Sequence, residues 1–212
     1  MSPAWMEKFI VREDPSGPTP DARRTSDKPV LKLQYHSLAD HRRILTIEGE
    51  EKTPVYEVTR KAILGAWGSK CHITAPPAHG ESDSNNEREV ALIDYHTFSY
   101  EIKFPARNDH RIDMKYGKRM FSASGGLGVL TWKGTGMEVA GAASWELRDE
   151  TSLVMVVSID QKQVTGWITL WKDGLDAQTV EELVLVGVSQ IEEDKRMLRN
   201  SKKSLVGAVA NA

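Results

Sequence analysis

The stretch LDAQTVEELVLVGVSQIEEDKRMLRN, from Leu175 to Asn200, decides the fold of this 212-residue chain. Asp176 and Thr179 are residue types that commonly cap the start of a helix, and Thr179 followed by Glu182 has the spacing of a capping box. Basic residues close the stretch, where they complement the negative end of a helix dipole: Lys195, Arg196 and Arg199. These signals predict a helix over residues 177–199.

The first half of this predicted helix is apolar on nearly every side. Its apolar residues are Val180, Leu183, Val184, Leu185, Val186, Val188 and Ile191. A helix that is apolar all round is a buried helix, and a polar face begins only at residue 189. The apolar run from Leu183 to Val188 is far too short to span a bilayer, so the remaining location is the interior of a β-structure. Gly187 would permit a close approach to a strand there.

The residues before this helix predict many short strands. Segments of alternating apolar and polar residues, bounded by turn-forming residues, recur with no helical pattern between them. They lie at 30–36, 43–48, 54–58, 70–74, 88–95, 98–104, 128–133, 137–149, 152–160 and 163–171, and alternation on both sides of Tyr116-Gly117 predicts a further hairpin. A barrel of about twelve strands is wide enough to enclose a helix. The predicted fold class is mainly β (α+β): an antiparallel barrel of about 12 strands around a C-terminal hydrophobic helix.

The domain organisation follows from composition along the chain. Residues 1–29 contain several prolines and little apolar periodicity, which is typical of a flexible arm. Residues 30–200 are expected to form the barrel with its central helix, and residues 201–212 a C-terminal tail. Residues 76–89 are rich in proline, serine, asparagine and charge, and predict a long exposed loop between strands.

The overall composition favours a soluble protein of the cytoplasm. The chain is 40% hydrophobic and 27% charged, and its formal net charge of −2 provides no overall basic field for nucleic acid. Cys71 is the only cysteine, so no internal disulfide can form, which favours a reducing compartment. The N-terminus lacks the apolar core of a signal peptide. We expect a cytoplasmic protein, soluble or peripheral to a membrane, with no transmembrane segment, nucleic-acid partner or cofactor.

No motif predicts catalysis or a metal site. Cys71 and His72 are neighbours on a predicted strand, so they point to opposite faces and cannot form a dyad. Asp94 and His96 share a strand face, but this spacing alone is a weak signal, and we expect no metal. The glycines of SGGLGVLTWKGTG, residues 124–136, lack the order of a phosphate-binding loop and are better explained as turns between strands.

The densest cationic stretch of the strand region surrounds the predicted hairpin turn. Its basic residues are Arg107, Arg111, Lys115, Lys118 and Arg119. On adjoining strands these side chains would converge on an anionic head group, because clusters of Lys and Arg are a recognised feature of phosphoinositide binding. The alternative is a solvated hairpin. A second basic cluster, at residues 195–203, is explained by the helix dipole.

Many short antiparallel strands followed by an apolar C-terminal helix resemble the tubby C-terminal-like fold, in which a barrel of about twelve strands wraps a central helix. Tubby proteins, phospholipid scramblases and LURP-one-related proteins share this fold. The stretch SLVMVVSID, residues 152–160, directly follows a charged turn and resembles the late strand of the LURP-one-related and scramblase branch. The resemblance extends over residues 30 to about 200 and is nearest to a divergent fungal-type family of unknown function.

The resemblance implies a binding module and not an enzyme, because tubby proteins are phosphoinositide binders. We expect the chain to bind anionic phospholipid head groups reversibly at an intracellular membrane surface, through the five basic residues named above. The alternative is a protein-interaction or scaffold domain, in which Trp5, Phe9 and the loop at 76–89 would matter more. Scramblase-like transport is disfavoured, because the chain has neither a membrane segment nor a cysteine cluster.

Overall fold

The computed structural model describes residues 28–39, 41–50, 53–63, 66–76, 88–108, 110–115, 119–137 and 142–210. The predicted N-terminal arm lies almost entirely outside these ranges. So do most of the loop predicted at residues 76–89 and Lys118 of the predicted basic site.

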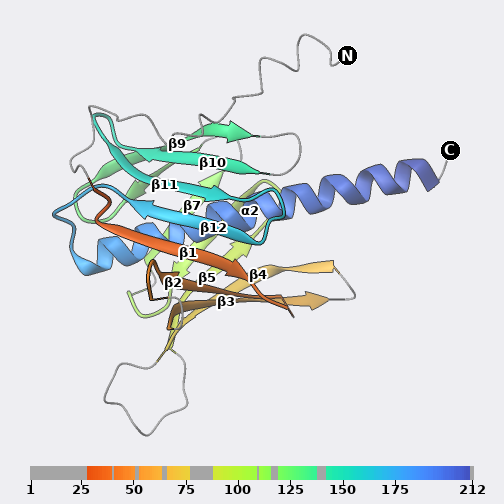
Figure 1. Cartoon of the computed structure of the whole chain (residues 1–212), viewed down its shortest axis with the longest axis horizontal. Helices are drawn as coiled ribbons and strands as arrows, with labels where there is room; N and C mark the ends of the chain where they lie inside the picture. Colours follow the sequence, from red (N-terminus) through yellow and green to blue (C-terminus); the bar gives the residue numbers. More distant parts are fainter. Residues whose placement is uncertain are drawn as a thin grey trace, which may run out of the picture.

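Twelve strands form one antiparallel sheet, which curls into a near-closed barrel (Figure 1). In chain order they are β1 (Leu31–Ser37), β2 (Arg42–Ile47), β3 (Pro54–Ile63), β4 (Ala66–Ala75), β5 (Arg88–Tyr95), β6 (Ser99–Phe104), β7 (His110–Lys115), β8 (Met120–Ala123), β9 (Gly128–Met137), β10 (Ala143–Arg148), β11 (Leu153–Ile159) and β12 (Thr165–Leu170). The sheet order is β7-β6-β5-β4-β3-β2-β1-β12-β11-β10-β9-β8, so β1 and β12 join two meanders. The predicted fold class is confirmed.

The two edges of the sheet are β7 and β8, on either side of the predicted turn at Tyr116-Gly117. The alternation there correctly predicted two strands. In the described residues, however, β7 pairs with β6 and β8 pairs with β9, and the two strands form no ladder with each other. They lie next to one another at the seam of the barrel. The predicted hairpin pairing is wrong, because alternation identifies a strand and does not say which neighbour it bonds.

The C-terminal helix, α2 (Ala177–Ala210), runs through the barrel and projects from one end of it (Figure 1). All of the apolar residues from Leu183 to Val188 are buried, and so is Ile191. The predicted burial of the helix inside the strands is therefore confirmed. The helix begins where it was predicted but continues to Ala210, past residue 199. The intervening residues contain no proline that would stop a helix.

Two glycines allow close packing at the contact between α2 and the strands. A Cβ atom on Gly187 would lie 3.1 Å from Cγ2 of Ile168 and 3.2 Å from Cγ2 of Val157, so α2 lies closely against β11 and β12, as predicted. A Cβ atom on Gly166, in β12, would lie 2.5 Å from the backbone oxygen of Ser158 and 3.4 Å from Cδ1 of Ile191. These distances leave little room for a side chain at either position.

The start of α2 is capped by Asp176 and not by Thr179. The carboxylate of Asp176 accepts a hydrogen bond from the backbone N–H of Thr179 at 2.9 Å and one from its hydroxyl at 2.8 Å. These bonds lower the pKa of the Asp176 carboxyl. Thr179 lies within the first turn, so the predicted capping box with Glu182 does not form. Asp176 has the better position because it directly precedes the first helical residue.

Glu182 instead joins the start of α2 to the barrel wall. Its buried carboxylate accepts hydrogen bonds from the Ser124 backbone N–H at 2.8 Å and the Ser124 hydroxyl at 2.6 Å, and it lies 2.8 Å from Nε2 of His110. The glycine-rich stretch after Ser124 forms the β8–β9 connection, as its interpretation as a turn predicted. Gly125 has a φ of +65°, and a Cβ there would meet Oγ1 of Thr179 at 2.3 Å. The glycine therefore lets this turn lie directly on the helix.

The barrel has two ends, which differ in what they expose. We call the end at which α2 leaves the exit rim; it is formed by the turns after β1, β5 and β11, together with Lys115 and Arg119 on either side of the β7–β8 connection. We call the opposite end the start rim; it includes the turns after β6, β8 and β10 and residues 171–176. No helix in the described part of the chain is long and apolar enough to cross a membrane.

We predict that Gly166→Ala lowers the free energy of unfolding by about 1–3 kcal/mol, because the added methyl group overlaps a backbone oxygen that cannot move alone. Chemical denaturation measures this change. Gly134→Ala in β9 is the matched control, since its methyl group would meet the flexible end of Arg119 at 3.4 Å and Cδ1 of Trp145 at an ordinary 4.0 Å. Equal stability of the two variants would contradict the close approach at Gly166.

Candidate functional site

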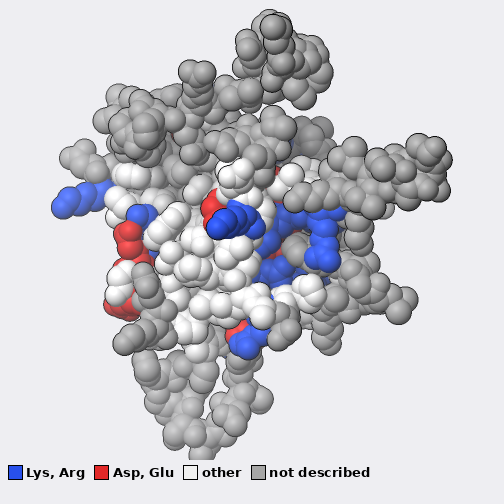
Figure 2. All heavy atoms as spheres, turned by 45° about the vertical axis from the view of Figure 1, so that its right-hand side comes forward, with Lys and Arg blue, Asp and Glu red and all other residues white. Residues whose placement is uncertain are grey.

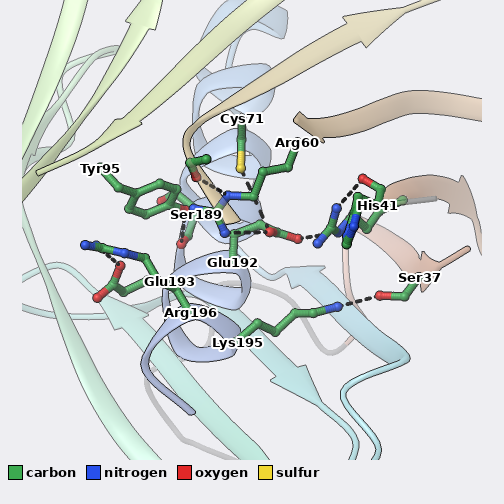
Figure 3. A network of polar contacts seen from close by, with 12 residues as sticks. Ser37, His41, Arg60, Cys71, Tyr95, Ser189, Glu192, Glu193, Lys195 and Arg196 are labelled. Carbon is green, nitrogen blue, oxygen red and sulfur yellow. Dashed lines mark hydrogen bonds and ion pairs between the residues drawn. The ribbon is translucent and has the colours of Figure 1, made fainter. Parts of the chain in front are cut away.

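A buried cluster of charged residues lies where α2 approaches the exit rim (Figure 3). Glu192 is at its centre and is fully buried. Its Oε1 atom lies 3.0 Å from Nε of Arg43 in β2, and its Oε2 atom lies 3.5 Å from NH1 of Arg60 in β3. Both arginine side chains are almost completely buried. Burial of charges in an apolar interior is costly unless they are paired, and these three groups meet that condition together.

Two neutral groups complete the coordination of Glu192. The Tyr35 hydroxyl in β1 donates to Oε1 at 2.5 Å, and the Cys71 thiol in β4 lies 3.9 Å from Oε2. Burial, reinforced by the charge of Glu192, raises the pKa of Tyr35 well above its usual value and that of Cys71 to about 12. Cys71 therefore remains a thiol at neutral pH and cannot act as a nucleophile there.

Lys195 extends the cluster toward the surface of the exit rim. Its Nζ atom donates to the Tyr35 hydroxyl at 3.1 Å, to the backbone oxygen of Gln163 at 2.8 Å, and to the hydroxyl of Ser37. Burial lowers the pKa of Lys195 to about 8, against the opposing effect of Glu192. The ammonium group thus connects α2 to the ends of β1 and β12, and it still carries its charge at neutral pH.

Tyr95 connects the buried arginine to an arginine nearer the solvent. The guanidinium of Arg60 lies 4.6 Å from the centre of the Tyr95 ring, and that of Arg196 lies 5.3 Å from it. The Tyr95 hydroxyl donates to the backbone oxygen of Ser189 at 3.3 Å. Arg196 also donates to the backbone oxygen of His96 at 3.2 Å, in the turn after β5. Cationic groups therefore follow one another from the interior to the exit rim, and Figure 2 shows lysine and arginine gathered beside the emerging helix.

The arrangement around Glu182 does not form a catalytic relay. Ser124 and Glu182 both approach the same ring nitrogen of His110, Nε2, at 3.4 Å and 2.8 Å. A serine–histidine–carboxylate triad uses the two different ring nitrogens, one toward the nucleophile and one toward the carboxylate. Ser124 also donates directly to the carboxylate. This cluster holds the β8–β9 turn against α2.

Asp94, His96 and Glu101 form the one group in the described chain whose ligand atoms approach closely enough for a metal ion, all within 4.8 Å of one another. The sequence pointed to Asp94 and His96 but missed Glu101, which lies opposite Asp94 on the neighbouring strand. Both carboxylates already have cationic neighbours: Lys70 lies 3.7 Å from Asp94, and Lys103 lies 2.7 Å from Glu101. The lysines occupy the role that a bound cation would have, so this group is best described as a surface ion-pair network.

Four of the five predicted basic residues are described, and these four do not converge on one site. Arg107 is at the start rim, where it pairs with Glu181 at 2.5 Å and lies 3.8 Å from Glu182. Arg111 is exposed on the barrel wall, 3.7 Å from Asp113. Lys115 and Arg119 are both at the exit rim and exposed, and Lys118 is outside the described residues.

The residues around Glu192 were not found from the sequence, for a physical reason. Arg43, Arg60 and Glu192 are far apart in the chain, and each occupies a position that an exposed charge could equally occupy. Lys195 was assigned to the helix dipole, whereas it is buried against β1. One signal was present: Arg43 follows the alternation of β2 on its inward face, two residues before the buried Leu45.

The fold and this cluster define a mainly β protein, a near-closed antiparallel barrel around a helix that carries buried charges near its exit. No known protein family matches the chain, and no curated protein matches its sequence. Among solved structures, the chain is similar to a protein from Arabidopsis thaliana determined by X-ray crystallography. The two are 10% identical, the match covers 80% of this chain and 95% of that one, and the TM-score is 0.41. A similarity of this size does not establish a family.

We predict that Glu192→Gln lowers the free energy of unfolding by about 3–5 kcal/mol, because it removes the buried negative charge that faces the two buried guanidinium groups of Arg43 and Arg60. Urea denaturation measures the change. Glu48→Gln is the matched control: Glu48 pairs with Lys32 on the surface at 2.5 Å, and such a pair contributes about 1 kcal/mol or less. Equal losses in the two variants would mean that the buried cluster contributes no more than a surface pair.

Asp194 predicts a specific dependence of stability on pH. Burial raises the pKa of its carboxyl from 3.8 to about 6. The folded chain therefore holds this proton more tightly than the unfolded chain does. The stabilising contribution of protonated Asp194 to the free energy of unfolding is complete below about pH 3.8 and is lost as the pH rises through about 6. Relative to Asp194→Asn, the wild-type chain should lose up to about 3 kcal/mol of stability over this range. Urea denaturation at a series of pH values measures this difference. If the free energies of unfolding of the two chains changed with pH in parallel, Asp194 would have an ordinary pKa and the prediction would be wrong.

Proposed function

We propose that this protein binds anionic phospholipid head groups, among them phosphoinositides, through its exit rim. The observation that carries the proposal is a set of three exposed cations at that rim: Lys115, Arg119 and Lys162. Lys162 lies in the turn after β11, next to Gln163, whose backbone oxygen accepts from Lys195. In the described part of the chain, none of the three side chains forms an ion pair or hydrogen bond.

Several carboxylates at the same rim have charged or hydrogen-bonding partners. Asp94 and Glu101 have neighbouring lysines, as described above. Glu193 lies 3.5 Å from NH1 of Arg196, and Asp160 accepts the backbone N–H of Val164 at 2.8 Å. The three exposed cations therefore form a local positive surface at the exit rim, although the chain as a whole has a formal net charge of −2. A local positive surface of this kind attracts anionic lipids by about 1 kcal/mol for each basic residue near the membrane.

The resemblance to the tubby C-terminal-like fold supports the same function. It agrees with the confirmed architecture, a twelve-stranded antiparallel barrel around a helix. On this proposal the protein is a non-enzymatic binding module that associates reversibly with an intracellular membrane from the cytoplasm. Binding rests mainly on charge, so it weakens as the salt concentration rises.

We predict that the triple variant Lys115→Ala, Arg119→Ala and Lys162→Ala binds phosphoinositide-containing vesicles about 100-fold more weakly, from the loss of three charges of about 1 kcal/mol each. Co-sedimentation at low and physiological salt measures the affinity, with neutral phosphatidylcholine vesicles for comparison. The matched control is Arg88→Ala, Arg111→Ala and Lys133→Ala, which removes the same number of exposed charges away from the exit rim.

The outcomes separate the candidate functions. A loss confined to the exit-rim variant supports the proposal and places the site. Equal losses in both triple variants would mean that binding follows net charge alone, and Arg111 would return as a candidate. No binding of the wild-type chain at either salt concentration would exclude the proposal and favour a protein-interaction domain.

A further inference from the structure

The exit rim also exposes large apolar side chains, beside its cations. The exposed fractions are 81% for Phe98, 52% for Met197, 48% for Met120, 46% for Leu38 and 40% for Val164. These residues come from four different turns or strand ends and from α2 itself. In the described chain, the other exposed large apolar residues are Val30 and Val129, which lie toward the start rim. The apolar exposure is therefore concentrated at the end of the barrel that carries the cations.

Backbone hydrogen bonds hold these side chains in place at the rim. The N–H of Leu38 donates to the backbone oxygen of Arg42, which closes the turn after β1. Val164 donates to Asp160 and its backbone oxygen accepts from Ser37, so the turns after β1 and β11 are joined. Phe98 lies in a turn closed by the bond from His96 to Ser99. A single exposed apolar residue needs no explanation, but apolar side chains gathered at one end of a molecule are typical of an interaction surface.

The helix adds an apolar segment at the same end. α2 continues beyond Met197 and projects from the exit rim (Figure 1). Its sequence there carries Lys202 and Lys203, followed by the uncharged residues SLVGAVA to Ala210. At 1.5 Å per residue, Lys203 is roughly 9 Å along the axis from Met197. The head-group layer of a bilayer is roughly 5–8 Å thick, so the part of α2 beyond Met197 is long enough to cross it.

We propose that the barrel docks end-on, with the exit rim facing an anionic bilayer. Leu38, Phe98 and Val164 enter the interfacial layer, and the last turns of α2 reach the acyl chains. This inference rests on the proposed function, because the exposed cations supply the attraction that brings the rim to the surface. It adds an orientation and a second source of affinity, since burial of apolar side chains is not screened by salt.

The protein offers a direct probe of this orientation. Its single cysteine, Cys71, is fully buried, and burial raises the pKa of its thiol to about 12, so it reacts poorly with thiol reagents. A cysteine introduced at an exposed position therefore takes up an environment-sensitive fluorophore selectively. Phe98→Cys places the fluorophore at the exit rim, and Val129→Cys is the matched control toward the start rim. The wild-type chain serves as the labelling blank.

With vesicles of phosphatidylcholine and phosphoinositide, we expect the emission of labelled Phe98→Cys to shift to the blue while that of labelled Val129→Cys does not change. We also expect the variant Leu38→Ser, Phe98→Ser and Val164→Ser to bind about tenfold more weakly at physiological salt. Sedimentation of the chain without a shift at position 98 and without loss in the serine variant would overturn insertion and leave charge-driven binding in place. Equal shifts at both positions would overturn the end-on orientation. Absence of sedimentation altogether would overturn the proposed function and this inference with it.

Discussion

The rest of the structure depends on the burial of a helix that is apolar on all sides. Leu183 to Val188 of α2 have no exposed face, so the strands must surround them completely. Twelve strands give a barrel of sufficient width, and Gly166 and Gly187 bring the helix and the wall into contact. The hydrophobic effect thus explains why the chain encloses α2. It does not explain why α2 lies at one depth within the barrel, because an apolar surface is compatible with many positions.

The depth of the helix is determined by buried charges at the two ends of its apolar segment. Glu182 meets Ser124 and His110 near the start rim, and Glu192 meets Arg43 and Arg60 near the exit rim. A shift of α2 by one turn would move both carboxylates about 5 Å from these partners and separate the buried charge of Glu192 from those of the two arginines. Buried ion pairs add little to the free energy of unfolding compared with apolar residues of similar size. They do, however, make every other depth of α2 in the barrel less favourable. Specificity of packing is the best supported reason for buried charges of this kind.

The architecture could be predicted well from the sequence, because the strands and the enclosed helix each have a recognisable local pattern of apolar residues. Alternation located the strands, and the continuous apolar surface of residues 180–191 indicated an enclosed helix. Which strands pair with each other was harder to predict from the sequence. The strands on either side of Tyr116 show the alternation of a hairpin, yet they form the two edges of the sheet. The buried charged cluster could not be predicted from the sequence, because Glu192 reaches Arg43 and Arg60, on the neighbouring strands β2 and β3, only when the barrel encloses the helix. The cations Lys115 and Arg119 were found from charge alone, whereas Arg107 is engaged by Glu181, which no local pattern indicates.

The two rims of the barrel expose different side chains. On the proposed function, this difference determines which end of the barrel faces the membrane. At the start rim, turns are fixed to the helix by Asp176 and Glu182. At the exit rim, exposed cations and exposed apolar side chains occur together. Amide hydrogen exchange of the free chain and of the chain bound to phosphoinositide vesicles would test this asymmetry most directly. We expect slower exchange in the turns after β1, β5 and β11 and in α2 beyond Met197, with no change in the turns after β6 and β10. Protection at the start rim, or none at the exit rim, would contradict it.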